Sequence, residues 1–488
     1  MTIALLIVIP LAGCLAVLAF RSPPMNRAVA LASTLGTAAL AALAVREYLA
    51  SGAPLTFALS GTVGSFVRLS ADGIALPLVA LTAVLSVVAI LVSWNAERLN
   101  AHLALLLALE AAVLAVFLAA DLVLFYVAWE AVLIPMFFLI GGWGHEGRRL
   151  AAMKFFVYTF AGSALMLIAL VILVLAQGGH EMVPAGTVAL GPQEQLVFWL
   201  LALGFLVKIP VWPLHTWLPD AHVEAPTSGS LMLAGVLLKM GGYGILRLCI
   251  PYAPNAFSEA APLLAVLGGI GIVYGAAVAL GQSDLKRLVA YSSVAHMGFV
   301  VLGLASGTEL GMQGAMLAMV SHGVVAALLF LLVGSLYDRS HTREMSAFGG
   351  LGTSMPKWAT VFVFACLASL GLPGLSGFPG EFAAVTGSFV RFGWPVALVG
   401  LGVVLAGAYN LRAIRTVVHG ERAEPGAGGS PSSEMGGAKH LSDLVPRELL
   451  AIAPLAILIV LLGVWPRIVT DLAGSSIADL LATLAGAR

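Results

Sequence analysis

The chain has 488 residues, of which 60% are hydrophobic and 10% are charged, and its formal net charge is zero. A soluble domain carries about 25% charged residues, and apolar stretches recur here from end to end. We therefore expect a polytopic membrane protein rather than a soluble enzyme. No basic stripe suggests nucleic acid. The three cysteines lie far apart, which excludes a disulfide framework and a cysteine cluster for zinc or iron–sulfur, and no P-loop or convincing dinucleotide fingerprint appears.

The first stretch, "MTIALLIVIPLAGCLAVLAF", allows two interpretations. "LAGC", ending at Cys14, resembles a lipoprotein cleavage box. A signal peptide has a positively charged region before its apolar run, and none precedes this one. We therefore interpret the stretch as the first transmembrane helix.

At about 20 residues per span, the apolar pattern predicts about fourteen transmembrane helices and hence an all-α polytopic fold. The expected spans are 2–20, 27–47, 72–95, 99–119, 121–142, 151–176, 194–222, 226–250, 260–281, 285–305, 309–337, 357–391, 393–418 and 447–465. The tail after Pro466 is expected to form a short amphipathic helix.

Basic residues gather in the loops that follow odd-numbered helices, such as "RSPPMNR", "HEGRRLAAMK", "SDLKR" and "YDRSHTREM". The loops after even-numbered helices are poor in lysine and arginine. Because basic loops stay in the cytoplasm, we expect the N-terminus to lie outside. The Gly/Ser-rich stretch between residues 419 and 446 predicts a flexible cytoplasmic loop.

Two expected helices are interrupted by proline. "GFLVKIPVWPLHTWLPDAH" contains Pro210 and Pro213, and "ASLGLPGLSGFPGEF" contains Pro373 and Pro379. Proline removes a backbone donor, and irregular backbone persists at membrane depth only where protein or a wet cavity satisfies it. Interrupted segments at matching positions of two halves are typical of an inverted-repeat transporter.

The two breaks lie five helices apart, which favours two five-helix repeats. The expected division of the chain is 1–98 for helices 1–3, 99–250 for a first repeat of helices 4–8, 260–418 for a second repeat of helices 9–13, 419–446 for the loop, and 447–488 for the last helix and the amphipathic tail.

Ionisable side chains lie inside the expected spans. They are Glu110, Glu130, Lys208, Lys239, Glu381, His215, His296 and His322. A charge at the bilayer centre costs about 2.5–3.5 kcal/mol on insertion scales, so each needs a partner or a role. Carboxylates, lysines and histidines at mid-membrane are the composition of a proton path. No three or four of them cluster as metal ligands, so no metal site is expected.

Lys208 could snorkel to the interface, but Trp212 and Trp217 follow it, so its helix does not plainly end there. Burial and a nearby carboxylate act in opposite senses on the proton affinity of a lysine. A lysine whose proton affinity is balanced by these two opposing effects can bind and release a proton. Glu130, inside "LFYVAWEAVLIPMFFL", could be a neutral carboxyl bonded to a neighbouring helix, or the carboxylate paired with Lys208.

Lys239 lies in the middle of "SLMLAGVLLKMGGYGIL", too far from either end for easy snorkelling, so a partner or a wet cavity is expected. Glu381 follows the second break and could cap a half-helix or end the proton path. Glu110 resembles Glu130 in its placement.

Four histidines lie in or beside the expected spans. His296 and His322 could be packing residues or proton relays. His215 and His222 flank the first break and are expected to mark its wet end.

Long segments between about residues 95 and 420 resemble one family. They are "LVKIPVWPLHTWLPDAHVEAPTSGSLMLAGVLLKMGGYGILR", "FYVAWEAVLIPMFFLIGGWG", "DLKRLVAYSSVAHMGFV", "SHGVVAALLFLLVGSLYDR" and "GLPGLSGFPGEF". They are similar to the antiporter-like membrane subunits of NADH–quinone oxidoreductase, respiratory complex I, and most of all to the M-type. The resemblance implies a fourteen-helix core with two inverted five-helix repeats and broken helices seven and twelve.

The same resemblance implies roles for single residues. Glu130 matches the helix-five glutamate, Lys208 and Lys239 match the lysines of helices seven and eight, and Glu381 matches the terminal ionisable residue of helix twelve. The sister L-type and N-type subunits usually carry lysine at that last position, so the glutamate favours the M-type. The candidate relays Glu110 and His322 match intramembrane positions of the family more loosely. The third candidate relay, His296, is predicted from its place among the other ionisable groups.

The resemblance further implies a proton-translocating module in a bacterial inner membrane. No cofactor is expected on this chain, whereas FMN, iron–sulfur clusters and quinone are expected in other subunits. The expected partners are the adjacent L-type and N-type subunits and the lipid bilayer. A subunit of a multi-subunit Na⁺/H⁺ antiporter or of a membrane-bound hydrogenase remains an alternative, as does a non-conducting scaffold. A stand-alone solute transporter would need a substrate cavity with recognition groups, which the sequence does not show.

Overall fold

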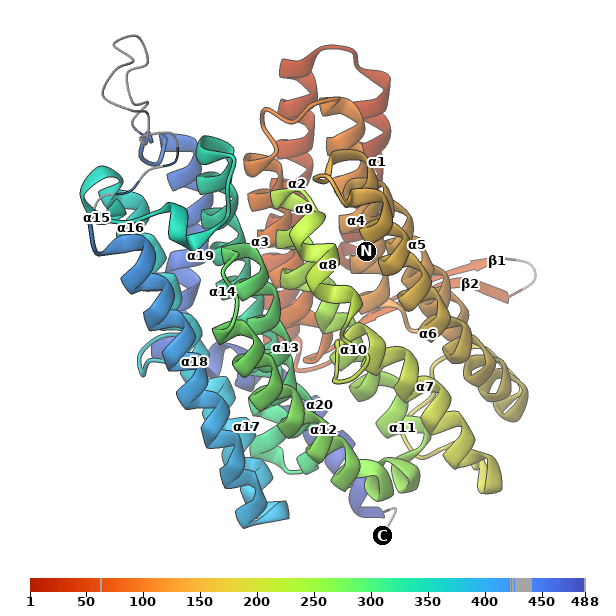
Figure 1. Cartoon of the computed structure of the whole chain (residues 1–488). Helices are drawn as coiled ribbons and strands as arrows, with labels where there is room; N and C mark the ends of the chain where they lie inside the picture. The colour runs from red at the N-terminus through yellow and green to blue at the C-terminus, as the bar shows by residue number, and fades with distance from the viewer. Residues whose placement is uncertain (62–63, 422, 424, 426–440, 487–488) are drawn as a thin grey trace, which may run out of the picture.

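A computed structural model describes the chain except for residues 62–63, 422, 424, 426–440 and 487–488. Most of the expected loop at 419–446 therefore lies outside the described residues. The molecule is a bundle of helices with one β-hairpin (Figure 1). The α-helices are α1 (Thr2–Ala19), α2 (Pro23–Ser51), α3 (Ala75–Val92), α4 (Leu99–Leu118), α5 (Leu122–Trp143), α6 (Arg148–Gln177), α7 (Glu194–Lys208), α8 (Trp217–Glu224), α9 (Thr227–Met232), α10 (Leu238–Gly244), α11 (Ile250–Tyr252), α12 (Pro254–Leu280), α13 (Leu285–Ser306), α14 (Glu309–Ser340), α15 (Leu351–Ser354), α16 (Pro356–Leu370), α17 (Gly377–Phe392), α18 (Gly400–Ala413), α19 (Pro446–Val464) and α20 (Arg467–Gly486).

Short 3₁₀- and π-helical segments continue or join these helices. They are η1 (Gly191–Gln193), η2 (Leu233–Leu237), η3 (Ile245–Cys249), η4 (Met345–Ala347), η5 (Trp394–Val399) and η6 (Ile414–Val418). Two of the π-helical segments, η2 and η3, lie inside the continuous helix Thr227–Tyr252.

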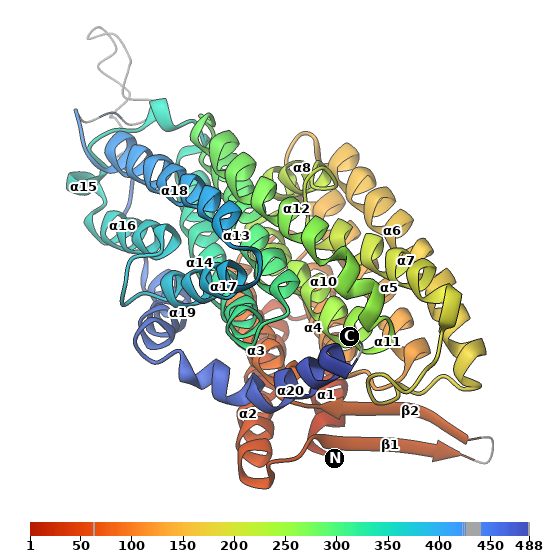
Figure 2. The same ribbon diagram turned by 90° about the horizontal axis from the view of Figure 1, so that it is seen from below.

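Thirteen helices in the described part of the chain are long and apolar enough to cross a membrane. One of them, α20, runs across its neighbours rather than alongside them (Figure 2). The other twelve, together with the two interrupted helices formed by α7 with α8 and by α16 with α17, make fourteen. The expected all-α polytopic fold with about fourteen transmembrane helices is therefore confirmed.

The first expected break lies between α7 and α8. α7 ends at Lys208, and the backbone of Pro210 has a φ of +32° before α8 begins at Trp217. The indole N–H of Trp217 donates to the carbonyl oxygen of Val207 at 3.0 Å. This bond occupies a carbonyl group that the interrupted helix no longer pairs.

The second expected break separates α16 from α17. Gly371 ends α16 in the left-handed region with a φ of +80°, which favours glycine. At Gly377, the first residue of α17, an added Cβ would lie 2.2 Å from the carbonyl oxygen of Ala368. Glycine is therefore required both to turn the chain and to let the two half-helices approach.

A β-hairpin between the second and third spans was not expected from the sequence. β1 (Leu55–Gly61) pairs antiparallel with β2 (Gly64–Ala71), and a register shift lies between Leu59 and Ser60. The hairpin projects sideways from the bundle (Figure 2). Short period-two stretches carry a weaker signal than the long apolar runs on either side of them, which explains the omission.

Two equivalent backbone bridges fix the starts of α5 and α13. Asp121 pairs with Glu181 and Asp284 pairs with Glu344, at the same separation along the chain. Each aspartate carboxylate also accepts hydrogen bonds from the N–H groups two and three residues ahead, as an N-cap does. His145, just after α5, lies edge-on to Tyr337 of α14 at the end where α13 begins, so the two bridges lie at opposite ends of the bundle.

Candidate functional site

Lys208 is fully buried at the end of α7, against aromatic rings. Its Nζ lies 5.7 Å from the ring centroid of Trp129 and 5.4 Å from that of Phe155, within cation–π range. Nζ has no hydrogen-bond partner among the described residues. Glu130 on α5 acts on Lys208 electrostatically, but the two form no ion pair in this part of the chain. The expected pair is therefore not in direct contact, and its role stays a prediction.

Lys239 is fully buried in mid-helix and is held by a backbone carbonyl and a histidine. Its Nζ donates to the carbonyl oxygen of Ala234 and lies within hydrogen-bond distance of Nδ1 of His322, at 2.8 Å. Ala234 belongs to the π-helical segment η2, whose wider turns displace carbonyl groups from α-helical pairing. This segment supplies an acceptor for the ammonium group at membrane depth.

A row of side chains continues from Lys239 through two histidines to Glu381. The rings of His322 and His296 have their centroids 5.5 Å apart, and Nδ1 of His296 lies 2.6 Å from Oε1 of Glu381. The four residues come from α10, α14, α13 and α17, and we call them the central row. The central row brings together four of the residues selected from the sequence.

A small cavity lies beside the central row. It has a volume of about 20 Å³ and is lined by both histidines, Ser321, Ser369 and Glu381, among others. This is room for about one water molecule. Nε2 of His322 and the hydroxyl of Ser321 have no protein partner in the described chain, so a water there could bond both groups.

Glu110 lies apart from the central row. It is fully buried in α4, where the hydroxyl groups of Ser86 and Thr37 approach it. Its carboxylate oxygens make no hydrogen bond with any described residue. The structure thus does not bring this candidate relay into contact with the others.

The two histidines beside the first break are buried, so the expectation that they mark a wet end is wrong. His215 is 3% exposed and lies edge-on to Tyr274, with ring centroids 5.1 Å apart. His222 is fully buried and stacks on Phe330 at 4.5 Å. Packing of the second half-helix against α14 removes His222 from solvent.

Three further polar residues, which the sequence alone does not predict, are buried in this half of the bundle. Lys286 follows a loop, yet its side chain is buried and its Nζ donates to the carbonyl oxygens of Val223 and Ala225, at the end of α8. Ser369 and Tyr409 contact His296. A signal for Tyr409 was available, because a tyrosine in mid-span needs a polar partner for its hydroxyl group.

Charged groups gather where α5 ends and α13 begins. Arg343 pairs with Asp284 at 3.2 Å, and the carboxylate of Glu224 accepts a hydrogen bond from the N–H of Gly147 at 2.9 Å. His145 lies in the loop beside them, where burial and then the charges of Lys286 and Arg343 lower its pKa to about 4. His145 is therefore neutral at physiological pH.

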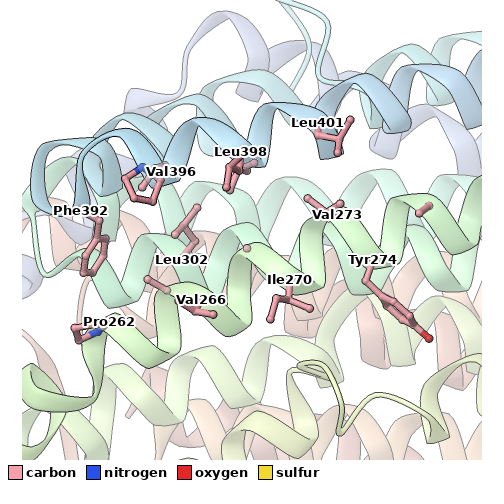
Figure 3. Close-up of a pocket in the computed structure, with 15 residues that line it drawn as sticks. Pro262, Val266, Ile270, Val273, Tyr274, Leu302, Phe392, Val396, Leu398 and Leu401 are labelled. Atoms are coloured by element: carbon pink, nitrogen blue, oxygen red, sulfur yellow. The ribbon is translucent and has the colours of Figure 1, made fainter.

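A separate groove of about 720 Å³ lies between α12 and the segment formed by η5 and α18 (Figure 3). Its lining is apolar, with residues such as Val266, Leu398 and Leu401, except for the hydroxyl of Tyr274. No ionisable residue of the central row lines it. The groove therefore offers nothing that could recognise a polar substrate, and it adds no group to the candidate site.

Comparisons with known proteins agree with the sequence resemblance. Residues 119–406 match the family model described as NADH:quinone oxidoreductase/Mrp antiporter, TM. NADH-quinone oxidoreductase subunit M of Rhodobacter capsulatus is 44% identical over 434 residues, which cover 86% of this chain and 83% of that protein.

Solved structures show the same architecture. A chain of respiratory complex I from Thermus thermophilus with bound NADH superposes with a TM-score of 0.87 at 30% identity, and the match covers 99% of both chains. A chain of the Mrp complex from Dietzia sp. DQ12-45-1b has a TM-score of 0.85 at 19% identity, covers 100% of this chain and 99% of that one, and so shares the fold. The fourteen helices, the two breaks and these matches agree: the chain belongs to the NADH:quinone oxidoreductase/Mrp antiporter family, as an antiporter-like membrane subunit.

Proposed function

We propose that this chain is the M-type membrane subunit of a bacterial NADH–quinone oxidoreductase and that it moves protons across the inner membrane. The observation that carries the proposal is the central row, in which four ionisable side chains from four helices meet at membrane depth. Relatives with over 40% identity are named subunit M of that enzyme, which supports this assignment over the other members of the family.

In this mechanism Lys208 exchanges a proton with the cytoplasmic side or with the centre of the protein. The charge of Glu130 sets the proton affinity of Lys208 through space. Lys239 receives the proton and passes it to His322 and His296, which lie within hydrogen-bond reach or one water of each other. Glu381 then releases it outward. Each step moves a proton between nitrogen and oxygen atoms and requires no covalent intermediate.

The repeats and the orientation form a second part of the proposal. The two equivalent bridges at opposite ends of the bundle are what two related five-helix units of opposite direction would produce, which supports the division at 99–250 and 260–418. Basic residues at the end where α5 meets α13 support a cytoplasmic position for that end and an outer position for the N-terminus. The adjacent subunits would be of the L-type and N-type. FMN, iron–sulfur clusters and quinone would belong to other subunits.

The test is Lys208→Ala in the complete complex, with Lys357→Ala, an exposed lysine, as the matched control. Loss of a positioned proton carrier should slow pumping by about 100-fold or more. Oxidation of NADH with an artificial acceptor should stay unchanged, because it does not use the membrane arm. An unchanged proton-to-electron ratio in Lys208→Ala would remove Lys208 from the mechanism.

Two other functions give different outcomes. The family model also covers Mrp antiporters, so a subunit of a multi-subunit Na⁺/H⁺ antiporter is the second candidate, and the subunits that co-purify would identify it. A non-conducting scaffold would tolerate Glu130→Gln and Lys239→Met without loss of pumping. The proposal predicts that both substitutions block it.

A further inference from the structure

Two hydroxyl groups occupy the side of His296 that faces away from Glu381. Nε2 of His296 lies 3.2 Å from Oγ of Ser369 and 3.5 Å from the hydroxyl of Tyr409. Ser369 is in the last turn of α16, directly before the second break, and Tyr409 is on α18. Both side chains are buried, at 3% and 0% exposure. The imidazole is therefore held at both nitrogens by groups from three different helices.

Within the described part of the chain, the hydroxyl of Ser369 makes no hydrogen bond to its own helix, and it faces His296 and the hydroxyl of Tyr409. Buried serines in helices often donate to a carbonyl three or four residues back, as Ser292 does to Val289 at 2.8 Å. The hydrogen bond of Ser369 instead goes to His296. Nδ1 of His296 faces the carboxylate of Glu381, which only accepts when it is ionised, and this favours Nε2 as the nitrogen that accepts the hydroxyl proton of Ser369.

A hydroxyl that donates to Nε2 decides where the imidazole carries its own proton. A neutral histidine has one donor and one acceptor nitrogen, and the bond made by one nitrogen sets the state of the other. With Nε2 as the acceptor, Nδ1 carries the hydrogen and points it at Oε1 of Glu381, 2.6 Å away. This is the tautomer that can hand a proton to the carboxylate.

We propose that Ser369 and Tyr409 are positioning residues of the proton path, which hold His296 in the tautomer that delivers its proton to Glu381. This inference rests on the proposed function. In this inference the second helix break serves the proton path, because α16 ends at Leu370 and the hydroxyl of Ser369, one residue earlier, lies beside His296.

The test compares Ser369→Thr with Ser369→Val in membrane vesicles that contain the complete complex. Threonine and valine have nearly the same shape, so they disturb the packing equally, and only threonine keeps the hydroxyl. Ser369→Val should slow proton pumping about fivefold, the factor that corresponds to one hydrogen bond of ordinary strength. Ser369→Thr should pump at close to the native rate. Equal rates in the two variants, whether low or normal, would overturn the role of Ser369.

Tyr409→Phe tests the second hydroxyl, with Tyr48→Phe as a control at a buried tyrosine far from the row. Tyr409→Phe should slow pumping by a similar factor, and normal pumping would remove Tyr409 from the inference. All rates are divided by NADH oxidation with an artificial acceptor, which reports the amount of assembled complex. Glu381→Gln tests the proposed function separately from the positioning role of Ser369 and Tyr409. Normal pumping in Glu381→Gln would overturn the proposed function itself.

Discussion

The buried ammonium groups of this chain are stabilised in different ways. Lys239 has a carbonyl group and a histidine as partners, and Lys286 has two carbonyl groups at a helix end. Lys208 has only the faces of Trp129 and Phe155. A cation–π contact gives about 2 kcal/mol when desolvated, less than the cost of burying the charge. Of these three lysines, Lys208 is the one whose ammonium group has no hydrogen-bond partner among the described residues.

Glu110 provides a test of which carboxyl groups belong to the path. Because it does not contact the central row, Glu110→Gln should leave the proton-to-electron ratio unchanged. Glu381→Gln removes the carboxylate that faces His296 and should slow pumping by about 100-fold or more. The measurement is proton release per NADH oxidised in vesicles.

A lowered proton-to-electron ratio in Glu110→Gln would contradict this prediction. If Glu110→Gln lowered the ratio while the complex remained assembled, Glu110 would be a relay, reached by a route that its neighbours Ser86 and Thr37 do not reveal.

The sequence was sufficient to select Glu130, Lys208, Lys239 and Glu381, because a charge inside an apolar run is costly wherever the helix packs. It was not sufficient to show their contacts, which depend on how four helices from distant parts of the chain meet. Ser369 was missed because serine is common in membrane helices, where its hydroxyl usually bonds the preceding turn.

Among the elements, the long helices were the easiest to predict and the short irregular ones the hardest. Length and apolar composition define a span, and proline marks a break. The π-helical segments η2 and η3 carry no such mark in the sequence. The hairpin β1–β2 was missed for a related reason, because its stability depends on packing against the bundle.

One residue links the hairpin to the helices. Asp72 follows β2, its carboxylate accepts from the N–H groups of Ile74 and Ala75, and it pairs with Arg247 at 2.7 Å. Burial acts to raise the pKa of Asp72, but the charge of Arg247 and these hydrogen bonds outweigh it and hold the pKa below its usual range. The folded state therefore favours the ionised carboxylate.

The stabilisation that ionised Asp72 provides decreases as the pH falls. Because the folded pKa lies below the unfolded value of about 3.9, the contribution is complete above that pH and is lost as the pH falls through the folded pKa. Asp72→Ala should lower the free energy of unfolding by about 3 kcal/mol at pH 7. The difference from the native chain should shrink below about pH 4. Unfolding titrations in mixed micelles measure both values.

Asp471→Ala is the matched control, because Asp471 is exposed. It should change the free energy of unfolding by less than about 0.5 kcal/mol at either pH. A loss for Asp72→Ala that stayed constant down to pH 2 would show that the carboxylate charge is not the cause.

At the scale of the whole molecule, several basic residues gather at one end of the bundle. One end carries Arg343, Lys286 and the exposed pair Arg148 and Arg149. At the opposite end, Asp121 contacts His180. Basic residues are retained in the cytoplasm, so the proposed orientation has the basic end facing the cytoplasm.

Cysteine labelling tests this direction. In a background without the three native cysteines, Thr187→Cys lies in the exposed loop after α6 and Glu146→Cys lies in the exposed loop before it. An impermeant maleimide added to intact cells should label Thr187→Cys at once and Glu146→Cys only after the membrane is opened. The reverse pattern would place the N-terminus in the cytoplasm.

The ring of Trp129 beside Lys208 gives the molecule an optical reporter. The emission of an indole depends on the electric field across its ring, and Nζ of Lys208 lies 5.7 Å from the centre of that ring. The chain has nine tryptophans, so a form that keeps Trp129 alone would be needed to isolate this signal. Its fluorescence would then follow the charge on Lys208 during turnover, in real time and without an attached dye.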